Sequence, residues 1–431
     1  MSRRHTAFAA ESTENTFNGS VAPGKRIVAT IQRVADLLGE CWLEISLTKG
    51  SGTSFFAAEQ LIQSATLEIG GTQVDRITNH VLRAYSELFR SSEEKAAYAA
   101  AVDFAESDAA GTVRTFYVPL CFSFCRAPAN YLPVVALQFH EIRITIDLAS
   151  AADLAKVGVD ASSAAQFGVK LMTESIWLDA EERKRTAQSS SENLIQQVQI
   201  AEESIKIGTN KATTNVRLAI NHPVFLQAWY VRDAEIPGKT FPGPLVHSTK
   251  VPTDEKLNPI AELNLSFNGH TRVARKGSYF GVQQPLQYFK TNPQSGIGCF
   301  SYALKPSDPT HPSGSVNCSR IDHIAAAVTT KKASAASANA ILLVDEDTLS
   351  DAATQLQNFT FVSWNWNVLR ITSGKSFFFF FFFGMKQYCL LRGMTHNTSL
   401  SFSVQEWAVS LSGTLLHQFL HPKKHRCYFN P

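Results

Sequence analysis

The feature that most constrains the fold is the stretch from residue 117 to residue 148, because its composition is that of a β-sheet and none of it resembles a catalytic segment. In its last seven residues, Ile142 to Leu148, apolar and polar side chains alternate without a break. A period of two places one face of a strand in a core and the other in water. Two apolar runs at 118–124 and 131–139 flank a turn-forming segment, and we expect both to be strands.

Length and composition set the class of protein. The 431 residues exceed one ordinary domain and accommodate two cores of about 200 residues each. A net charge of +3 is too weak for a nucleic-acid groove, so no specific nucleic-acid partner is expected. Seven irregularly spaced cysteines argue against a disulfide framework. No apolar run of about 18 residues and no secretory leader is present, so no transmembrane segment is expected.

The first half of the chain reads as local antiparallel pairing. Residues 1–22 are polar and are expected to form a flexible N-terminal arm. A hairpin is expected at 61–77, turning at Gly70 and Gly71, which tolerate positive φ. Helices are expected over 81–89 and from about residue 93, after a Ser91–Glu94 capping box. Other strands are expected at 25–31, 42–47 and 169–179, with a loop at 149–168 and a charged linker at 180–199.

The second half keeps the all-β character without visible repetition of the first. Its strands are expected at 197–205, 212–220, 224–232, 261–267, 298–304, 319–327, 340–344 and 359–371. Proline-rich loops separate several of these runs. Many short strands with Gly, Pro and Asn turns and few helices indicate sandwiches or barrels.

Several blocks of the sequence resemble one family in the order in which that family has them. They begin with the segment 126–144, in which Arg126, Pro128, Tyr131 and Pro133 precede an Ala-Leu-Gln-Phe-His-Glu-Ile run. The others are 61–77, 177–199, 219–232, 267–280, 299–322 and 361–374. The pattern is similar to the major capsid proteins of large eukaryotic DNA viruses, of the iridovirus and phycodnavirus type. Together the blocks cover most of residues 25–374.

The resemblance implies an all-β chain of two consecutive eight-stranded antiparallel jelly rolls with short helical insertions. It places the first roll at 23–188 and the second at 189–374. It further implies a homotrimer that forms pseudo-hexagonal capsomers of an icosahedral virion, assembled in the host cytoplasm with minor capsid and penton proteins. The residues with structural roles in the motifs are Gly70, Gly71, Asp75, Arg126, Pro133, His140, Asn221, His222, Pro223, Asn268, Gly269, Pro312, Ser313, Gly314, Asn317, Arg320 and Asp322.

The C-terminal part departs from the family. After Gly374 come Lys375, Ser376, seven phenylalanines and 48 further residues, where the family's chains end soon after this point. A phenylalanine homopolymer is a poor strand and an aggregation hazard if exposed. We therefore interpret residues 375–431 as an atypical tail, translated from an unspliced intron or after a frameshift.

Sites of chemistry are scarce in this sequence. No catalytic, cofactor-binding or metal-binding residue is assigned, and the protein is not expected to be an enzyme. Cys121 and Cys125, four residues apart, are interpreted as buried core thiols. Arg320 and Asp322 are expected to share a strand face and pair. Glycosylation motifs mark Asn18, Asn264 and Asn358 as candidate acceptors, although such short motifs are common by chance.

Two alternatives come from other classes of protein. The first is a two-domain β-sandwich that binds carbohydrate, with Trp229, Tyr230, Trp364 and Trp366 as sugar platforms. The second is a jelly-roll enzyme of the cupin kind, which needs a His/His/Glu metal set that the alternating strands do not supply.

Overall fold

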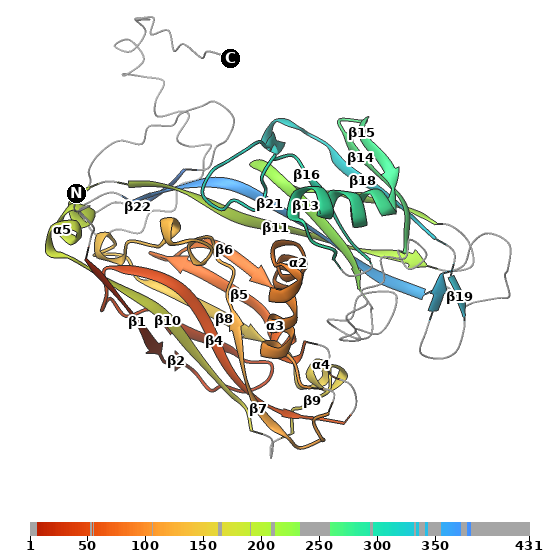
Figure 1. The fold of residues 1–431 in the computed structure, drawn as a ribbon. Coiled ribbons are helices and arrows are strands. Elements are labelled where there is room, and N and C mark those ends of the chain that lie inside the picture. Colours follow the sequence, from red (N-terminus) through yellow and green to blue (C-terminus); the bar gives the residue numbers. More distant parts are fainter. Residues whose placement is uncertain are drawn as a thin grey trace, which may run out of the picture. The chain divides into compact units, whose positions relative to one another are not determined.

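A computed structural model describes residues 7–51, 54, 56–105, 107–162, 166–189, 191–207, 212–232, 259–293, 296–331, 333–335, 341–343, 355–371 and 377–380. Residues 1–385 form one compact unit. Within it, Figure 1 shows a first group of strands in red to yellow and a second in green to blue.

The first group forms two antiparallel sheets, and its elements follow the alternation of the sequence. Sheet 1A has the order β1-β10-β4-β7, and sheet 1B has the order β2-β3-β8-β5-β6. The strands are β1 (Phe8–Asn15), β2 (Phe17–Asn18), β3 (Arg26–Thr30), β4 (Leu37–Lys49), β5 (Ile62–Ile69), β6 (Thr72–Thr78), β7 (Val113–Pro119), β8 (Ile142–Leu148), β9 (Val159–Asp160) and β10 (Gly168–Leu178). In β8 the isoleucines are buried and Arg143 is exposed, as predicted.

The second group repeats this arrangement. Sheet 2A has the order β11-β21-β13-β16 and sheet 2B the order β12-β18-β14-β15. The strands are β11 (Ser191–Ile207), β12 (Thr213–Arg217), β13 (Pro223–Arg232), β14 (Ile260–Phe267), β15 (His270–Lys276), β16 (Ile297–Ser301), β17 (Val316–Asn317), β18 (Ile324–Thr330), β19 (Ala333–Ala335), β20 (Ile341–Leu343), β21 (Gln355–Ile371) and β22 (Phe377–Phe380). Apart from the short or peripheral strands β2, β9, β17, β19, β20 and β22, each group has eight strands, and these eight have the same spatial order in both groups. The prediction of two consecutive jelly rolls is therefore confirmed.

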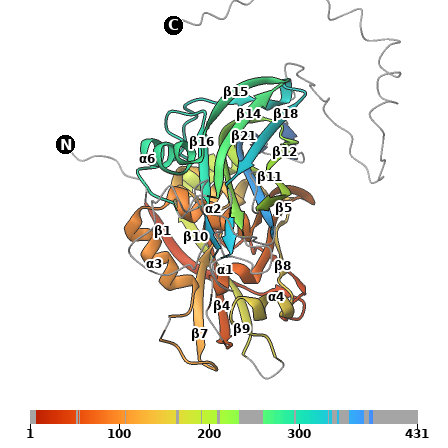
Figure 2. The ribbon, with the colours of Figure 1, turned by 90° about the vertical axis from the view of Figure 1, so that its right-hand side faces the viewer.

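Short helices interrupt the strands. They are α1 (Ala57–Leu61), α2 (Asn79–Phe89), α3 (Ser92–Val102), α4 (Ala151–Lys156), α5 (Ala180–Gln188), α6 (Gln284–Phe289), a π-helical turn η5 (Tyr279–Gln283), and the 3-10 turns η1 (Ser123–Cys125), η2 (Pro128–Asn130), η3 (Val134–Ala136) and η6 (Cys318–Arg320). The capping box before α3 is present, with Ser91 and Glu94 each accepting the other's backbone N–H. In both views α2 lies between the strands of the two rolls (Figures 1 and 2).

The expected flexible arm over residues 1–22 is wrong for residues 8–18. Residues 8–15 form β1, which pairs with β10 along its whole length. The segment is polar and shows no alternation, because most of its side chains are exposed and the ladder is made by backbone groups. The first roll therefore includes this strand, which covers the edge of β10.

Other expectations also differ from the structure. Residues 131–139 form turns rather than a strand, with η3 at their centre, because Pro128 and Pro133 interrupt the backbone hydrogen bonding. The expected loop at 149–168 contains α4 and β9. The expected strand at 319–327 begins only at Ile324. Strand β15 was not predicted, since its residues are mostly polar and exposed.

The phenylalanine run also pairs, contrary to the expectation of a poor strand. Residues 377–380 form β22, antiparallel to residues 368–371 of β21. Strand β13 pairs with β21 only as far as Asn365, so this edge of β21 is open to another strand. The backbone supplies these hydrogen bonds whatever the side chains are.

Candidate functional site

The junction between the two rolls is the best-built site among the described residues. Helix α2 of the first roll ends in Phe89, whose ring centroid lies 5.7 Å from that of Trp364 in sheet 2A and 5.0 Å from that of Phe289 in α6. Trp364 is fully buried. One continuous apolar core joins the interior of the first roll to this face of sheet 2A. The two rolls therefore fold against each other as one body.

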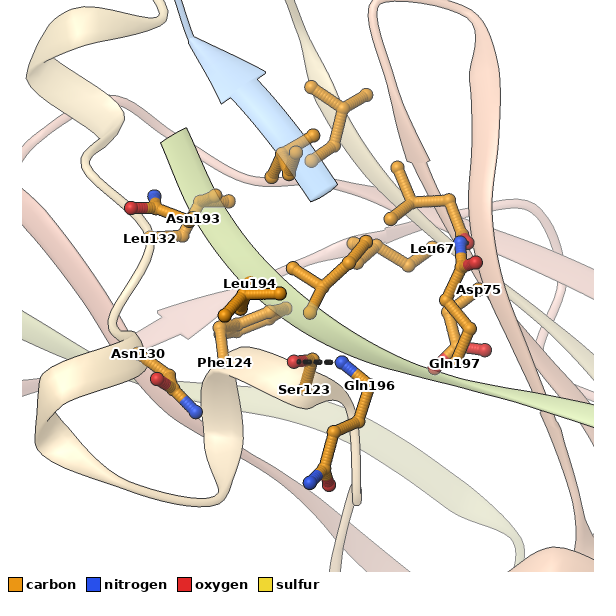
Figure 3. Close-up of a pocket in the computed structure, with 14 residues that line it drawn as sticks. Leu67, Asp75, Ser123, Phe124, Asn130, Leu132, Asn193, Leu194, Gln196 and Gln197 are labelled. Carbon is orange, nitrogen blue, oxygen red and sulfur yellow. Dashed lines mark hydrogen bonds between the residues drawn. The ribbon is translucent and has the colours of Figure 1, made fainter. Parts of the chain in front are cut away.

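A small pocket lies in the same junction, and Figure 3 shows the residues around it. Its walls come from sheet 1B, the turns at 123–132 and the start of β11, with Leu67, Phe124 and Leu194 among them. Its volume of about 20 Å³ accommodates roughly one water molecule. The Gln196 backbone N–H beside it donates to Ser123 Oγ at 2.9 Å. Such a pocket is a packing gap at an interface and does not hold a substrate.

A larger opening of about 460 Å³ lies at the opposite end of the first roll. Small side chains line most of it, including Gly50, Gly111 and Ala155. Lys49 is its cation, but the Lys49 ammonium already donates to the carbonyls of Ala105 at 3.2 Å and Asp108 at 2.7 Å. The opening therefore presents no free charge from this lysine to a ligand.

Polar groups at the junction form a buried cluster around Asp75. Its Oδ1 accepts from the backbone N–H of Arg76 at 2.9 Å and of Val198, in β11, at 3.4 Å. Burial raises the pKa of Asp75 to about 6, and the positive charge of Arg126 opposes that shift. Arg126 donates to Gln196 Oε1 and to the Cys121 carbonyl, so it links the two rolls. The motif residues Asp75 and Arg126 thus hold the junction.

A second buried carboxyl, Glu59, lies under the helices of the first roll. Neither of its carboxylate oxygens has a hydrogen-bond partner. Burial raises its pKa to about 8, against the attraction of Arg83. Arg83 is engaged by Glu87 at 2.7 Å. We interpret Glu59 as a structural group whose burial favours the neutral form.

The motif glycines of the first roll form a tight turn. Gly70 and Gly71 have φ values of 60° and 80°. A Cβ on Gly70 would stand 2.7 Å from His140 Nδ1, whereas a Cβ on Gly71 would meet nothing within 4 Å. The Gly70 N–H donates to the Glu141 carbonyl at 2.9 Å, which fixes the turn against the start of β8. His140 therefore packs against this turn.

The second roll has an equivalent turn at Asn268 and Gly269, where φ is 50° and 79°. The Asn268 N–H donates to the His323 carbonyl at 2.8 Å, and its side-chain oxygen accepts from the His323 N–H at 2.9 Å. The turn is thereby joined to the segment that precedes β18. An asparagine suits this position because its side chain tolerates the left-handed conformation and bonds locally.

The remaining motif residues hold three neighbouring segments together. The Asn221 N–H donates to Gln199 Oε1, and the His222 N–H donates to Ser319 Oγ at 2.8 Å. Pro223 pairs with Asn317, whose side-chain oxygen accepts from the Ser319 N–H at 3.1 Å. These bonds close the end of the second roll.

Pro312, Ser313 and Gly314 shape the loop after β16. Ser313 Oγ accepts from the Lys305 N–H at 2.8 Å. Gly314 has a φ of 140°, and a Cβ there would stand 2.8 Å from the Tyr302 carbonyl oxygen. In the first roll, Pro133 lies in the corresponding segment after β7, directly before η3.

The expected pairing of Arg320 with Asp322 is wrong. Residues 318–320 form η6, so the two side chains do not lie on one strand face. Both are exposed, and no ion pair joins them in the part of the chain that the structure describes.

Sequence reasoning missed the role of Asp36. This carboxylate is buried at 1% exposure, accepts from the Leu178 N–H at 2.9 Å and pairs with Arg183 Nε at 2.9 Å. It therefore ties the end of β10 to α5, the helix that leads into the second roll. An acidic residue directly before an apolar strand was the available signal.

The candidate glycosylation residues occupy different surroundings. Asn18 is exposed in β2. Asn264 is half-buried in β14, which pairs with β15 and β18 on its two sides. The backbone of Asn358 pairs with β11 and β13, while its side chain lies outside the described residues. A glycan on Asn264 would have to displace the groups that bury its side-chain oxygen.

The cysteines and the aromatic residues pack in the interior. Cys121 is buried, and burial raises its pKa to about 12, while Cys125 is half-buried in η1 and not on a strand. No group of three or more His, Cys, Asp or Glu with metal-binding geometry occurs among the described residues. No described helix is long and apolar enough to cross a bilayer. The carbohydrate-binding alternative is contradicted, since its platforms are at most 6% exposed: Trp229, Tyr230, Trp364 and Trp366.

Two eight-stranded rolls packed through an apolar junction define a double jelly-roll protein. Residues 1–179 match the family model "Major capsid protein N-terminus", and residues 182–376 match "Large eukaryotic DNA virus major capsid protein". The chain belongs to this family of major capsid proteins.

Individual relatives agree with this assignment. The major capsid protein of Paramecium bursaria Chlorella virus 1 is 36% identical over 401 residues, covering 86% of this chain and 91% of the relative. That of Pyramimonas orientalis virus is 32% identical, covering 74% and 83%. The crystal structure of PBCV-1 VP54 is similar with a TM-score of 0.78 and 33% identity, covering 87% of this chain and 97% of VP54. The Faustovirus major capsid protein shares the fold, with a TM-score of 0.62 and 12% identity.

Proposed function

We propose that three copies of this chain associate into a pseudo-hexagonal capsomer, and that these capsomers tile an icosahedral virus shell. The observation that carries the proposal is the repeated strand order of sheets 1A and 2A and of sheets 1B and 2B. Three chains with two similar rolls each supply six similar wedges, which a closed ring accommodates. The work of the protein is association, and we propose that it catalyses no reaction.

The wider setting follows from the same proposal. The protein would be located in the virion capsid, assemble in the host cytoplasm, and contact minor capsid and penton proteins as well as its own copies. We place the boundary between the rolls at residues 188 and 189, between α5 and β11. The change of family model between residues 179 and 182 supports a boundary in this region.

We further propose that residues 375–431 arise from an unspliced intron or a frameshift, and that the pairing of residues 377–380 with β21 is made by backbone groups alone. The family match ends at residue 376, which supports this proposal. Sequencing the transcript across codon 374 tests it. A message that continues in frame and uninterrupted through codon 431 would contradict it.

The experiment for the trimer is the molar mass in solution of residues 1–374 beside that of the full chain, by light scattering after gel filtration. We expect a stable trimer for the short form and aggregation for the long form. A monomeric short form, with only the full chain well folded, would require both the trimer and the foreign tail to be withdrawn.

A further inference from the structure

The outer face of sheet 2A is covered within the chain. Its β21 residues Val362, Trp364 and Trp366 are at most 6% exposed and belong to the apolar core that continues into the first roll. The cover consists of helix α2 and strand β6 of the first roll, together with the turns that follow β7. This junction is thus an interface between one roll and the sheet of the next.

The same face of sheet 1A has no such cover among the described residues. Tyr117 on β7 is 46% exposed, and Trp42 on β4 and Met172 on β10 are only half-buried. Strand pairing places them together, since Trp42 is opposite Met172 and Tyr117 is opposite Glu44, two residues further along β4. Tyr, Trp and Met are enriched at protein interfaces.

The second roll has its own counterpart of α2. Helix α2 lies between β6 and β7, the fifth and sixth of the eight equivalent strands of the first jelly roll, and η5 with α6 lies between the corresponding strands β15 and β16 of the second. Val282 and Leu286 are 38% and 63% exposed. They are four residues apart in continuous helix and therefore lie on one face. The structure describes no contact that covers this apolar face.

We propose that η5 and α6 of one copy pack on the outer face of sheet 1A of the next copy. This contact repeats between chains the contact that α2 makes with sheet 2A within a chain. The inference rests on the proposed trimer. The same rotation that relates the first roll to the second would then relate the second roll to the first roll of the next copy. Three chains, with six rolls, close a ring in which η5 and α6 of each copy cover sheet 1A of its neighbour.

The test compares exposed positions in residues 1–374, the form for which a stable trimer is expected. Leu286→Glu and Tyr117→Glu place a charge at the proposed contact, where burying it unpaired is unfavourable. Phe139→Glu is the matched control, because Phe139 is an exposed aromatic residue at 67% in a turn and lies on none of the strands or helices of the proposed contact. Light scattering after gel filtration gives the molar mass, and thermal unfolding shows that each variant is folded.

We expect a trimer for the unsubstituted short form and for its Phe139→Glu variant, and a monomer for the other two variants. A wild-type trimer that both charged variants retain overturns the inference and leaves the trimer intact. A monomeric wild type overturns the proposed function itself.

A second measurement does not depend on the folding of any variant. Lys170 is exposed beside Glu44 on sheet 1A, and Lys290 follows α6 directly. Copies labelled with ¹⁴N and ¹⁵N are mixed during assembly and treated with a lysine cross-linker. We expect a mixed-isotope Lys170–Lys290 link in the trimer fraction. Mixed trimers with this link only within single chains, or without it, contradict the proposed contact.

Discussion

Protonation of Asp75 should change the stability of the junction between the rolls in a direction that is unusual for a carboxylate. The Asp75 side chain is 5% exposed, and its pKa rises from 3.8 to about 6 on folding. Between these values the folded chain keeps a proton that the unfolded chain has lost. The free energy of unfolding therefore falls as pH rises from about 4 to about 6. Two pKa units correspond to about 3 kcal/mol.

The substitution Asp75→Asn isolates this contribution. Asparagine keeps an oxygen that accepts from the Arg76 and Val198 N–H groups but does not titrate in this range. Urea unfolding followed by tryptophan fluorescence, at one fixed protein concentration, gives the stability of both proteins between pH 4 and pH 7. We expect the free energy of unfolding of the variant, relative to that of the wild type, to increase by up to about 3 kcal/mol as pH rises across this range.

The contributions of other titrating groups cancel when the free energies of unfolding of the two proteins are subtracted. Glu59 changes stability in the same direction, but it is present in both. Asp308 acts in the opposite direction, because hydrogen bonds from Thr310 lower its pKa to about 2, but its contribution is lost only as pH falls below about 4, outside the range of this assay. A difference curve for Asp75→Asn that is flat, or that rises toward low pH, would refute the burial argument.

Three further outcomes are expected. Gly70→Ala should lower the free energy of unfolding by more than Gly71→Ala does. Both substitutions cost about 1–2 kcal/mol of left-handed strain, but only a Cβ on Gly70 also meets His140. Equal losses measured by urea unfolding would contradict this. Asp36→Ala should lower the free energy of unfolding by about 1–3 kcal/mol, because it leaves the Leu178 N–H unpaired. Arg183→Gln should lower it by at most about 1 kcal/mol, because the Arg183 side chain is exposed. The reverse order would show that Asp36 does not hold β10 to α5. Peptide mass spectrometry should find Asn264 unmodified in folded protein, because its side-chain oxygen is buried; a glycan there would show that this side chain is accessible.

The sheet strands with strong alternation could be predicted from the sequence, because burial of one face leaves a period of two. Strand β8 and the hairpin turning at Gly70 and Gly71 are confirmed for this reason. Strands β1 and β15 could not be predicted in this way, since their side chains face water and only the backbone specifies the pairing. Local apolar content also misled the expectation at 131–139, where prolines decide the conformation.

The site was harder to predict than the fold. The motif residues Asp75 and Arg126 could be named from the sequence. The bonds of Arg126 to Gln196, 70 residues away, and of Asp75 to Val198, 123 residues away, depend on how the rolls dock. The role of Asp36 depends in the same way on Leu178 and Arg183. Contacts between distant segments leave no periodic signal, so only the three-dimensional structure identifies them.

The absence of visible repetition between the two halves has a physical origin in their surroundings. Both rolls need the same alternation toward their own interiors, and many apolar sequences satisfy that requirement. Their outer faces differ, because Trp364 and Trp366 are buried within the chain while Trp42 and Tyr117 remain accessible. A face that must be buried during folding of one chain can be strongly apolar. A face that waits for another copy must stay compatible with water until assembly, and Glu44 and Lys170 beside Trp42 and Tyr117 meet that requirement.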